Sequence, residues 1–214
     1  MLEKLPEAVG HALRNHRAGL AHVAYNLIDL RTGTSTITVS SPAFHDHEPI
    51  PARFTADGEG VSPPLEWQGV PPGAASLVLM VEDADAPMPH PLVHAIAVGI
   101  APLDGELAEG ALDSVEQMPE GMSVGRNSYL QTGWLPPDPP PGHGVHRYAF
   151  QIFALTAGAE LSDTPRREAV LEAIRDHAIA SGCLIGTYER PDHTVAEAVR
   201  QADAAPMRVD LTLA

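Results

Sequence analysis

Two segments of the sequence join an apolar, strand-like run to a short polar cluster that is rich in proline. The first is SLVLMVEDADAPMPHPLVHAIAVGI, residues 76–100, and the second is PPDPPPGHGVHRYAFQIFAL, residues 136–155. Apolar runs of this kind are typical of strands that are buried on both faces. Because an unpaired buried charge is costly, aspartate and histidine in such runs indicate strand ends that meet around one polar pocket.

Turn residues separate the remaining apolar runs. The 21 prolines and 18 glycines are dispersed along the chain, which favours the turns of a β-rich fold over disorder. Residue periodicity predicts helices over 6–17, 163–181 and 194–202, and strands over 36–39, 77–81, 92–100, 146–155, 183–188 and 208–213. We expect residues 103–122 to be irregular. The sequence therefore predicts a mostly antiparallel β fold with one C-terminal packing helix and small helical additions.

Length and charge exclude several classes of protein. A chain of 214 residues can bury one sizeable core, so one domain with additions is expected. The formal net charge is −15 and Lys4 is the only lysine, which argues against partners such as nucleic acid or an anionic membrane surface. Cys183 is the only cysteine, so an intramolecular disulfide is impossible. The sequence shows neither a secretory pattern nor a membrane-spanning run, so we expect a cytoplasmic protein without stable membrane insertion.

The first polar cluster places a carboxylate at the end of a strand. Period-two alternation puts Asp83 on the same face as the apolar side chains at 77, 79 and 81. Asp85 follows, and Ala86–Pro87 must then turn the chain, which makes this bond a candidate cis peptide. On its own the segment is also compatible with a solvated acidic turn.

The polar residues of the two clusters could form one anion site. His94 lies inside an apolar run, where a lone histidine is more often a core residue than a ligand. His146 and Tyr148 should project to one side at the start of the next strand. If Asp83 accepts a hydrogen bond from an imidazole, it favours the cationic form of that ring. A cationic histidine beside a second histidine and a tyrosine hydroxyl would bind a small anion, most naturally phosphate.

The order of the motifs resembles the phosphatidylethanolamine-binding protein family, and more narrowly its bacterial branch called Raf-kinase-inhibitor-like. The similarity runs from Ser41 to Arg190 in one order and without large gaps. It rests on short segments that match the family one by one, namely Phe54–Gly58, Ser62–Leu65, Asp83–Pro87, His94, Gly125–Asn127, Pro136–Pro140, His146–Tyr148 and Gly186–Tyr188.

The resemblance implies a Greek-key type antiparallel β-sandwich with a small anion pocket at one end. In the family that pocket accepts phosphate-like groups, including phospholipid headgroups, without a metal or an organic cofactor. The family's cis bond would fall at Ala86–Pro87. Carried over by position, the ligand-binding residues would be Asp83, Asp85, Pro87, His94, Pro137, His146 and Tyr148.

The resemblance also divides the chain into three parts. Residues 41–190 would form the family domain, while 1–40 would be an N-terminal extension of a short helix plus a strand that packs on it. Residues 191–214 would be a C-terminal extension. Either extension could support association, including a homodimer.

This sequence departs from the family pattern near the pocket. Ala84 replaces the first proline of the turn, which loosens it, and Pro136 stands where the family usually has glycine. Asp138 stands where cysteine or another small residue is common. An additional carboxylate at the pocket mouth would repel an anion, so weaker anion binding is expected.

We expect a binding protein, with distinct roles for the side chains. His94 and His146 would donate to the anion, while Asp83 orients or charges an imidazole. Tyr148 would contribute its hydroxyl, and two of the prolines, Pro87 and Pro137, would shape the walls. Arg147 lies on the opposite pleat face and is expected to be a structural ion-pair partner.

Two alternatives remain open. A metalloenzyme could use His90 and His94 with Asp83, Asp85 and His146, although the prolines that flank His90 prevent the helix that would bring the two histidines together.

A hydrolase or another acid–base enzyme could use Asp83 with His94 or His146. The sequence contains no G-x-S-x-G motif, and neither Cys183 nor Ser128 is placed as an obvious nucleophile.

Overall fold

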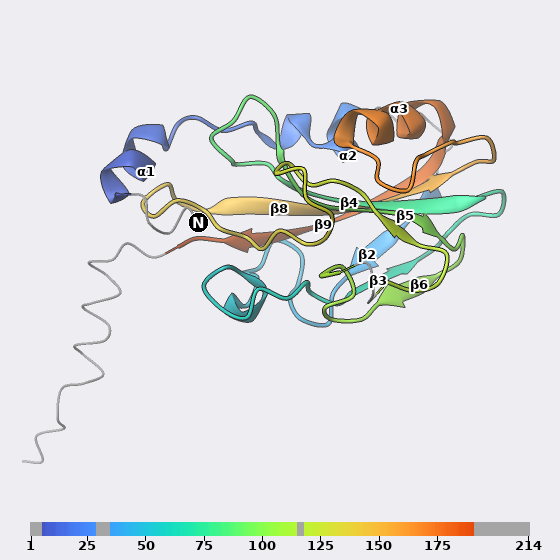
Figure 1. Cartoon of the computed structure of the whole chain (residues 1–214), viewed down its shortest axis with the longest axis horizontal. Coiled ribbons are helices and arrows are strands. Elements are labelled where there is room, and N and C mark those ends of the chain that lie inside the picture. The colour runs from blue at the N-terminus through green and yellow to red at the C-terminus, as the bar shows by residue number, and fades with distance from the viewer. Residues whose placement is uncertain (1–5, 29–34, 115–117, 191–214) are drawn as a thin grey trace, which may run out of the picture.

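The chain folds into two packed β-sheets with helices on the outer face of the larger sheet (Figure 1). The computed structural model describes residues 6–28, 35–114 and 118–190. The larger sheet has the order β1 (Ser35–Thr36), β9 (Ala178–Tyr188), β8 (His146–Leu155), β4 (Ser76–Asp83), β5 (Leu92–Ile100) and β7 (Ser123–Val124). The smaller sheet has the order β2 (Thr38–Ser40), β3 (Leu65–Gln68) and β6 (Gly105–Leu107). The predicted mostly β sandwich is confirmed, with β1 and β9 as a parallel pair.

The central strands are buried on both faces. In β4, Leu77, Leu79 and Val81 face the smaller sheet, while Val78 and Met80 pack against the helices. All five of these side chains are at most 1% exposed. This double burial explains why the sequence shows nearly continuous apolar runs instead of polar–apolar alternation.

Helices cover the outer face of the larger sheet. The longest is α3 (Arg167–His177), and the N-terminal part supplies α1 (Glu7–Leu13), the 3₁₀ turn η2 (Leu20–His22) and α2 (Ala24–Leu27). A further 3₁₀ turn, η3 (Ala52–Phe54), lies in a loop on the side of the smaller sheet. The predicted helix over 6–17 is therefore shorter than expected. The predicted helix over 194–202 and the predicted strand over 208–213 fall outside the described residues.

The boundary between α3 and β9 was predicted wrongly. The helix expected over 163–181 ends at His177, and Ala178 already begins β9. Residues 180 and 181 pair with β8 on one side and with β1 on the other, so sheet hydrogen bonds replace helical ones. Gly182 lies inside the strand at a close approach to its neighbour: a Cβ at this position would stand 2.0 Å from the carbonyl oxygen of Ile37, so the position requires glycine.

Short strands also appear where the sequence predicted a single strand or none. The expected strand over 36–39 is divided between β1 and β2, which belong to different sheets. The segment 103–122 is largely irregular, but it contains β6, which pairs with β3.

Residues 6–28, hereafter the N-terminal segment, run along the helix-covered side of the larger sheet and past one end of the sandwich (Figure 1). The amides of Ala18 and Gly19 donate to the carbonyls of Ala86 and Ala84, at 3.3 and 2.6 Å. The amide of Ala24 donates to the buried carboxylate of Glu82 at 2.7 Å. The segment is therefore bonded to the end of β4 and to the turn that follows it.

None of the described helices combines the length and the apolar character that crossing a bilayer requires.

Candidate functional site

A cavity of about 480 Å³, hereafter the histidine cavity, lies where β4 ends and β8 begins. Of the predicted site residues, it is lined by Asp83, Pro87, His94 and His146. The remainder of its wall is mostly apolar and comes from three loops and β5, with Ala56, Ala86, Met88, Leu92, Tyr129, Gln131, Leu135, Pro136, Asp138, Pro139 and Pro140.

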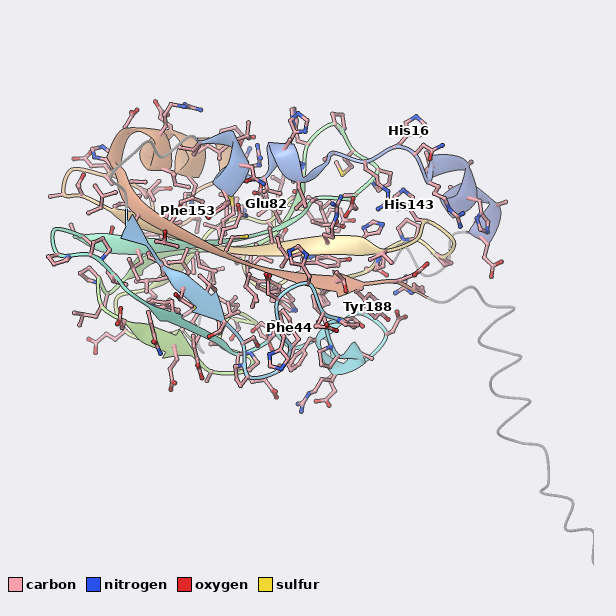
Figure 2. The ribbon with its side chains drawn as sticks, turned by 180° about the vertical axis from the view of Figure 1, so that it is seen from behind. His16, Phe44, Glu82, His143, Phe153 and Tyr188 are labelled. Carbon is pink, nitrogen blue, oxygen red and sulfur yellow. The ribbon has the colours of Figure 1, made fainter. Side chains whose placement is uncertain are left out.

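Asp83 contacts an imidazole, as the sequence suggested without deciding between His94 and His146, and the ring is that of His146. His146 Nδ1 lies 2.7 Å from Asp83 Oδ2, and both side chains are nearly inaccessible to water. His146 Nε2 lies 2.7 Å from Nδ1 of His143, whose Nε2 lies 2.9 Å from the carbonyl oxygen of Leu13. His143 lies at the end of the molecule that carries α1 (Figure 2). These four residues form a continuous hydrogen-bonded series, hereafter the imidazole chain.

The imidazole chain fixes how many protons the two rings carry. It contains three hydrogen bonds, and the Leu13 carbonyl and an ionised Asp83 can only accept. Two imidazoles supply three protons only if one of them is cationic. The ring that contacts the Asp83 carboxylate is His146, so the positive charge of the chain lies there, in an ion pair with Asp83. Burial and this neighbouring charge lower the pKa of His143.

Both ring nitrogens of His146 are thereby occupied. We predicted that His146 would donate to a bound anion, but in this arrangement no N–H of that ring remains available. Its contribution to a ligand in the cavity is a positive charge, not a hydrogen bond.

His94 has one nitrogen bonded and one without a partner. Its Nδ1 lies 2.5 Å from the carbonyl oxygen of Leu135 and must donate to it, while its buried Nε2 has no hydrogen-bond partner. Burial lowers the pKa of His94 and outweighs the opposing effect of Asp83, so the ring is neutral. Its Nε2 is therefore an unsatisfied acceptor in the wall of the cavity.

Tyr148 lies behind His94 and does not line the cavity. The His94 and Tyr148 rings meet edge to face with centroids 5.2 Å apart, and the Tyr148 hydroxyl is buried without a partner. Burial raises the pKa of this phenol well above its ordinary value, so the hydroxyl keeps its proton. Two unsatisfied polar groups thus belong to rings in direct contact.

Asp85 lies outside the cavity, although the resemblance placed it in the site. Its carboxylate accepts from Nη2 and Nε of Arg147 at 2.6 and 2.7 Å, and it forms an ion pair with Arg17 at 3.1 Å. Burial alone would raise the pKa of Asp85, but the two guanidinium groups outweigh it and lower the pKa. The turn after Asp83 breaks the alternation, and this is why the two carboxylates separate. Arg147 is the structural ion-pair partner that we predicted.

The proline walls also differ in detail from the prediction. Pro137 is buried and its carbonyl accepts from the amide of Ala56, so Pro136, Pro139 and Pro140 line the cavity in its place. The carboxylate of Asp138 does reach the cavity, but Arg190 Nη1 lies 2.8 Å from it. The repulsion that we expected between Asp138 and an anion is therefore reduced by a paired cation.

No peptide bond among residues 6–28, 35–114 and 118–190 is cis, so Ala86–Pro87 is trans, contrary to our prediction. The carbonyls of Ala84 and Ala86 each accept an amide of the N-terminal segment, and these hydrogen bonds hold the turn in its observed shape.

Sequence reasoning missed His143 and the carbonyls of Leu13 and Leu135. The spacing H-x-x-H over 143–146 was a visible signal for the first. The two carbonyls could not be identified from the sequence, because every residue type has a backbone carbonyl.

Of the five residues considered for a metal site, Asp83, His94 and His146 line the histidine cavity, whereas His90 and Asp85 do not. Among the described residues, no three His, Cys, Asp or Glu side chains are grouped so that they could hold a metal ion. His90 lies on an exposed loop that lines a different cavity, away from His94.

Groups suited to nucleophilic catalysis are likewise separated from the imidazoles. The described lining of the histidine cavity includes no serine, threonine or cysteine. Burial raises the pKa of the Cys183 thiol to about 12, so it is not a thiolate at neutral pH.

Comparison with known proteins agrees with this architecture. Residues 40–189 match the family model of the phosphatidylethanolamine-binding protein. A UPF0098 protein of Methanothermobacter thermautotrophicus is 39% identical over 154 residues, which is 72% of this chain and 99% of the relative. A Mycobacterium tuberculosis relative that carries the word lipoprotein in its name is 38% identical and matches 72% of each chain.

Solved structures give the same result. A phosphatidylethanolamine-binding protein homologue from Chlamydia trachomatis superposes with a TM-score of 0.63 at 35% identity, covering 74% of this chain and 99% of that one. YbcL of Escherichia coli, a member of the same family, gives a TM-score of 0.67 at 26% identity, covering 72% and 98%. The sandwich, the pocket at its end and these matches together show that this chain belongs to the phosphatidylethanolamine-binding protein family.

Proposed function

We propose that this protein is a ligand-binding module whose histidine cavity accepts a small phosphate-type anion, either free or as a phospholipid headgroup. The observation that carries the proposal is His94 Nε2, a buried nitrogen in the wall of the cavity that has no hydrogen-bond partner. Because an unsatisfied buried polar group is costly, a ligand that satisfies this nitrogen gains more than the same hydrogen bond in water would give.

A phosphate-type anion suits His94 Nε2 only if a proton accompanies it. His94 Nε2 either becomes protonated and donates, or it accepts from a P–OH group of the ligand. In both cases the complex holds one proton more than the empty cavity with its neutral His94. The positive charge of His146 attracts the anion without bonding to it.

A binding role is better supported than acid–base catalysis. The cavity combines apolar walls with a few polar groups, which is usual for small-molecule sites. Catalysis by Asp83 with His146 would need a free ring nitrogen, and both are engaged. A cytoplasmic location, a homodimer and regulation through protein partners remain expectations from the sequence.

Substitution of His94 tests the proposal. We expect His94→Phe to weaken binding of inorganic phosphate by about tenfold, because it deletes the hydrogen bond between Nε2 and the ligand. The free energy of unfolding without ligand should fall by about 1–3 kcal/mol, since the Leu135 carbonyl loses the Nδ1–H that it accepts. Calorimetric titration and urea unfolding measure the two quantities.

Phosphoethanolamine serves as a second titrant, because it separates an esterified headgroup from the free anion. His45→Phe is the control, since His45 is exposed and lies outside the cavity lining. Equal affinity of wild type and His94→Phe for both titrants would show that Nε2 has no role in binding and would remove the basis of the proposal.

A further inference from the structure

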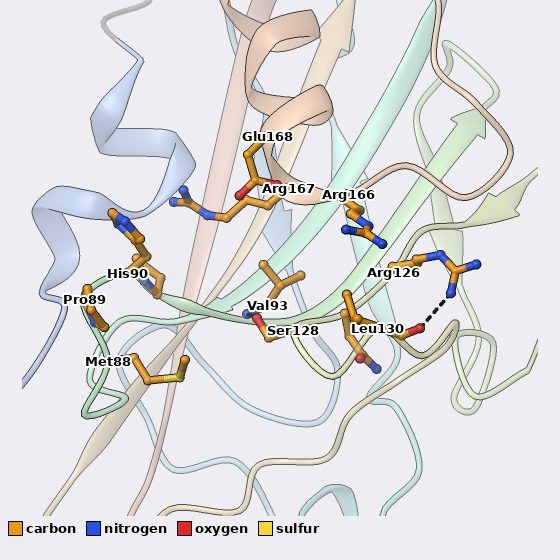
Figure 3. A pocket seen from close by; sticks show the side chains of 12 residues that line it. Met88, Pro89, His90, Val93, Arg126, Ser128, Leu130, Arg166, Arg167 and Glu168 are labelled. Atoms are coloured by element: carbon orange, nitrogen blue, oxygen red, sulfur yellow. Dashed lines mark hydrogen bonds between the residues drawn. The ribbon is translucent and has the colours of Figure 1, made fainter.

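A second cavity, of about 300 Å³, lies beside the histidine cavity and has a different character. We call it the arginine cavity; its lining residues are shown in Figure 3. Met88 contributes to both cavities, and the loops 86–91 and 126–131 each supply residues to both linings. These two loops therefore form a common wall, with the histidine cavity on one side and the arginine cavity on the other.

Close backbone packing places two guanidinium groups on one wall of the arginine cavity. The amide of Arg126 donates to the carbonyl of Pro165 at 2.8 Å, which brings the segment of Arg126 against the residue before Arg166. A Cβ on Gly125 would stand 2.6 Å from that same carbonyl oxygen, so only glycine permits the approach. Figure 3 shows Arg126 and Arg166 next to each other.

Among the residues that the structure describes, these two arginines differ from most others. Arg17, Arg147 and three further arginines (Arg53, Arg167 and Arg190) form ion pairs with carboxylates. Among the described contacts, the side chain of Arg126 donates only to the carbonyl of Leu130, at 2.8 Å, and that of Arg166 has no partner. In a chain with 28 acidic and 13 basic residues, two neighbouring arginines without a carboxylate are unexpected.

The other charged groups of the cavity do not cancel this positive charge. Arg167 is neutralised by Glu82, whose Oε1 lies 2.6 Å from its Nε. Glu168 also lines the cavity, but Figure 3 shows it beside Arg167 and on the far side from Arg126. A local positive potential is therefore left around Arg126 and Arg166.

Ser128 adds a neutral donor to the same cavity. Its Oγ accepts from the amide of Val93 at 2.8 Å, which leaves the hydroxyl proton free to donate elsewhere. Two guanidinium groups and one hydroxyl match the several oxygens of a phosphoryl group, which guanidinium forks bind in a bidentate manner.

We propose that the arginine cavity is a second anion site, which binds the phosphoryl group of a water-soluble phosphate compound through Arg126, Arg166 and Ser128. The net charge of −15 opposes approach to an anionic bilayer, so a free phosphate compound is favoured over a membrane. The site is distinct from the histidine cavity, because none of these three residues lines that cavity, although the two cavities share a wall.

Nuclear magnetic resonance of the full chain, titrated with inorganic phosphate, tests the two sites separately. We expect the Nε–H signals of Arg126 and Arg166 to shift with increasing phosphate. Arg126→Gln and Arg166→Gln should each weaken this binding by about tenfold, because each deletes a charge-assisted hydrogen bond. Arg175→Gln is the matched control, since it removes the same charge from α3 away from the cavity.

The outcomes separate this site from the proposed function. Shifts at Leu135 and Gln131 that His94→Phe abolishes report the histidine cavity, and they can persist or vanish regardless of Arg126 and Arg166. The second site is refuted if phosphate leaves the two arginine signals unmoved, or if Arg175→Gln weakens binding as much as the cavity variants do. Binding to vesicles with phosphatidic acid, without any response to phosphate, would identify a membrane surface and also overturn it.

Discussion

The two cavities share a wall but hold their charges in opposite ways. In the histidine cavity, Asp83 and His146 are buried and each has a partner supplied by the protein. In the arginine cavity, Arg126 and Arg166 are accessible to water and have no carboxylate partner. A buried charge has lost its hydration and needs a partner within the fold, whereas water solvates and salt screens an unpaired charge at the surface. Substitution of the charged residues in the histidine cavity should therefore destabilise the fold, whereas substitution of the arginines in the arginine cavity should change its stability little.

The largest expected effect comes from breaking the buried pair. Asp83→Ala leaves the cationic His146 without its partner, and we expect a loss of about 3–5 kcal/mol in the free energy of unfolding. Urea unfolding measures the loss. The control is Asp176→Ala, which removes an exposed carboxylate from α3 and should change stability by less than about 0.5 kcal/mol. Similar values for both variants would contradict the contrast between the cavities.

An intermediate effect is expected from pH. Burial, against the opposing charges of Asp83 and Asp138, holds the pKa of His94 below 6.5. The stability that neutral His94 contributes is therefore present above pH 6.5 and is lost as the pH falls below it.

Anion binding should change with pH in the opposite direction. Sulfate stays a dianion over this range, so its binding to the histidine cavity must protonate His94, and its affinity should rise about tenfold per unit of falling pH. Titrations at pH 7.5 and 6.5 measure the slope. His94→Gln should abolish this slope, and a slope that survives the substitution would place the proton elsewhere.

The smallest effect is expected at the arginine cavity. Arg126→Gln should change the free energy of unfolding by less than about 0.5 kcal/mol, because a half-buried arginine without a carboxylate partner contributes little. Thermal unfolding at low and high salt checks this. A loss comparable to that of Asp83→Ala would mean that the charges of the two cavities are equally structural.

Strand periodicity predicted the parts of the site that lie within strands. It placed Asp83 at the end of one strand and His146 at the start of another, and β4 pairs with β8 so that they meet. It failed beyond the strand end, where the turn directs Asp85 toward Arg147. Tyr148 has the predicted orientation, but it packs beneath His94 instead of reaching the cavity surface.

Contacts between distant segments could not be read from the sequence. His143 bonds to a backbone carbonyl 130 residues away, and backbone groups carry no residue signature. Likewise, Arg126 belongs to a matched family motif, but its closeness to Arg166 depends on how Gly125 packs against Pro165. The end of α3 was missed because sheet pairing with β1 and β8 outweighs the local helical preference.

The N-terminal segment has a practical consequence for the limits of the folding unit. The family match begins at residue 40, yet Leu13, Arg17 and Ala24 bond to His143, Asp85 and Glu82, respectively. A chain that starts at residue 40 would lack one partner for each of three buried groups, namely the carboxylates of Glu82 and Asp85 and the imidazole of His143. The shortest independently stable piece of this protein should therefore be longer than the piece its relatives have in common.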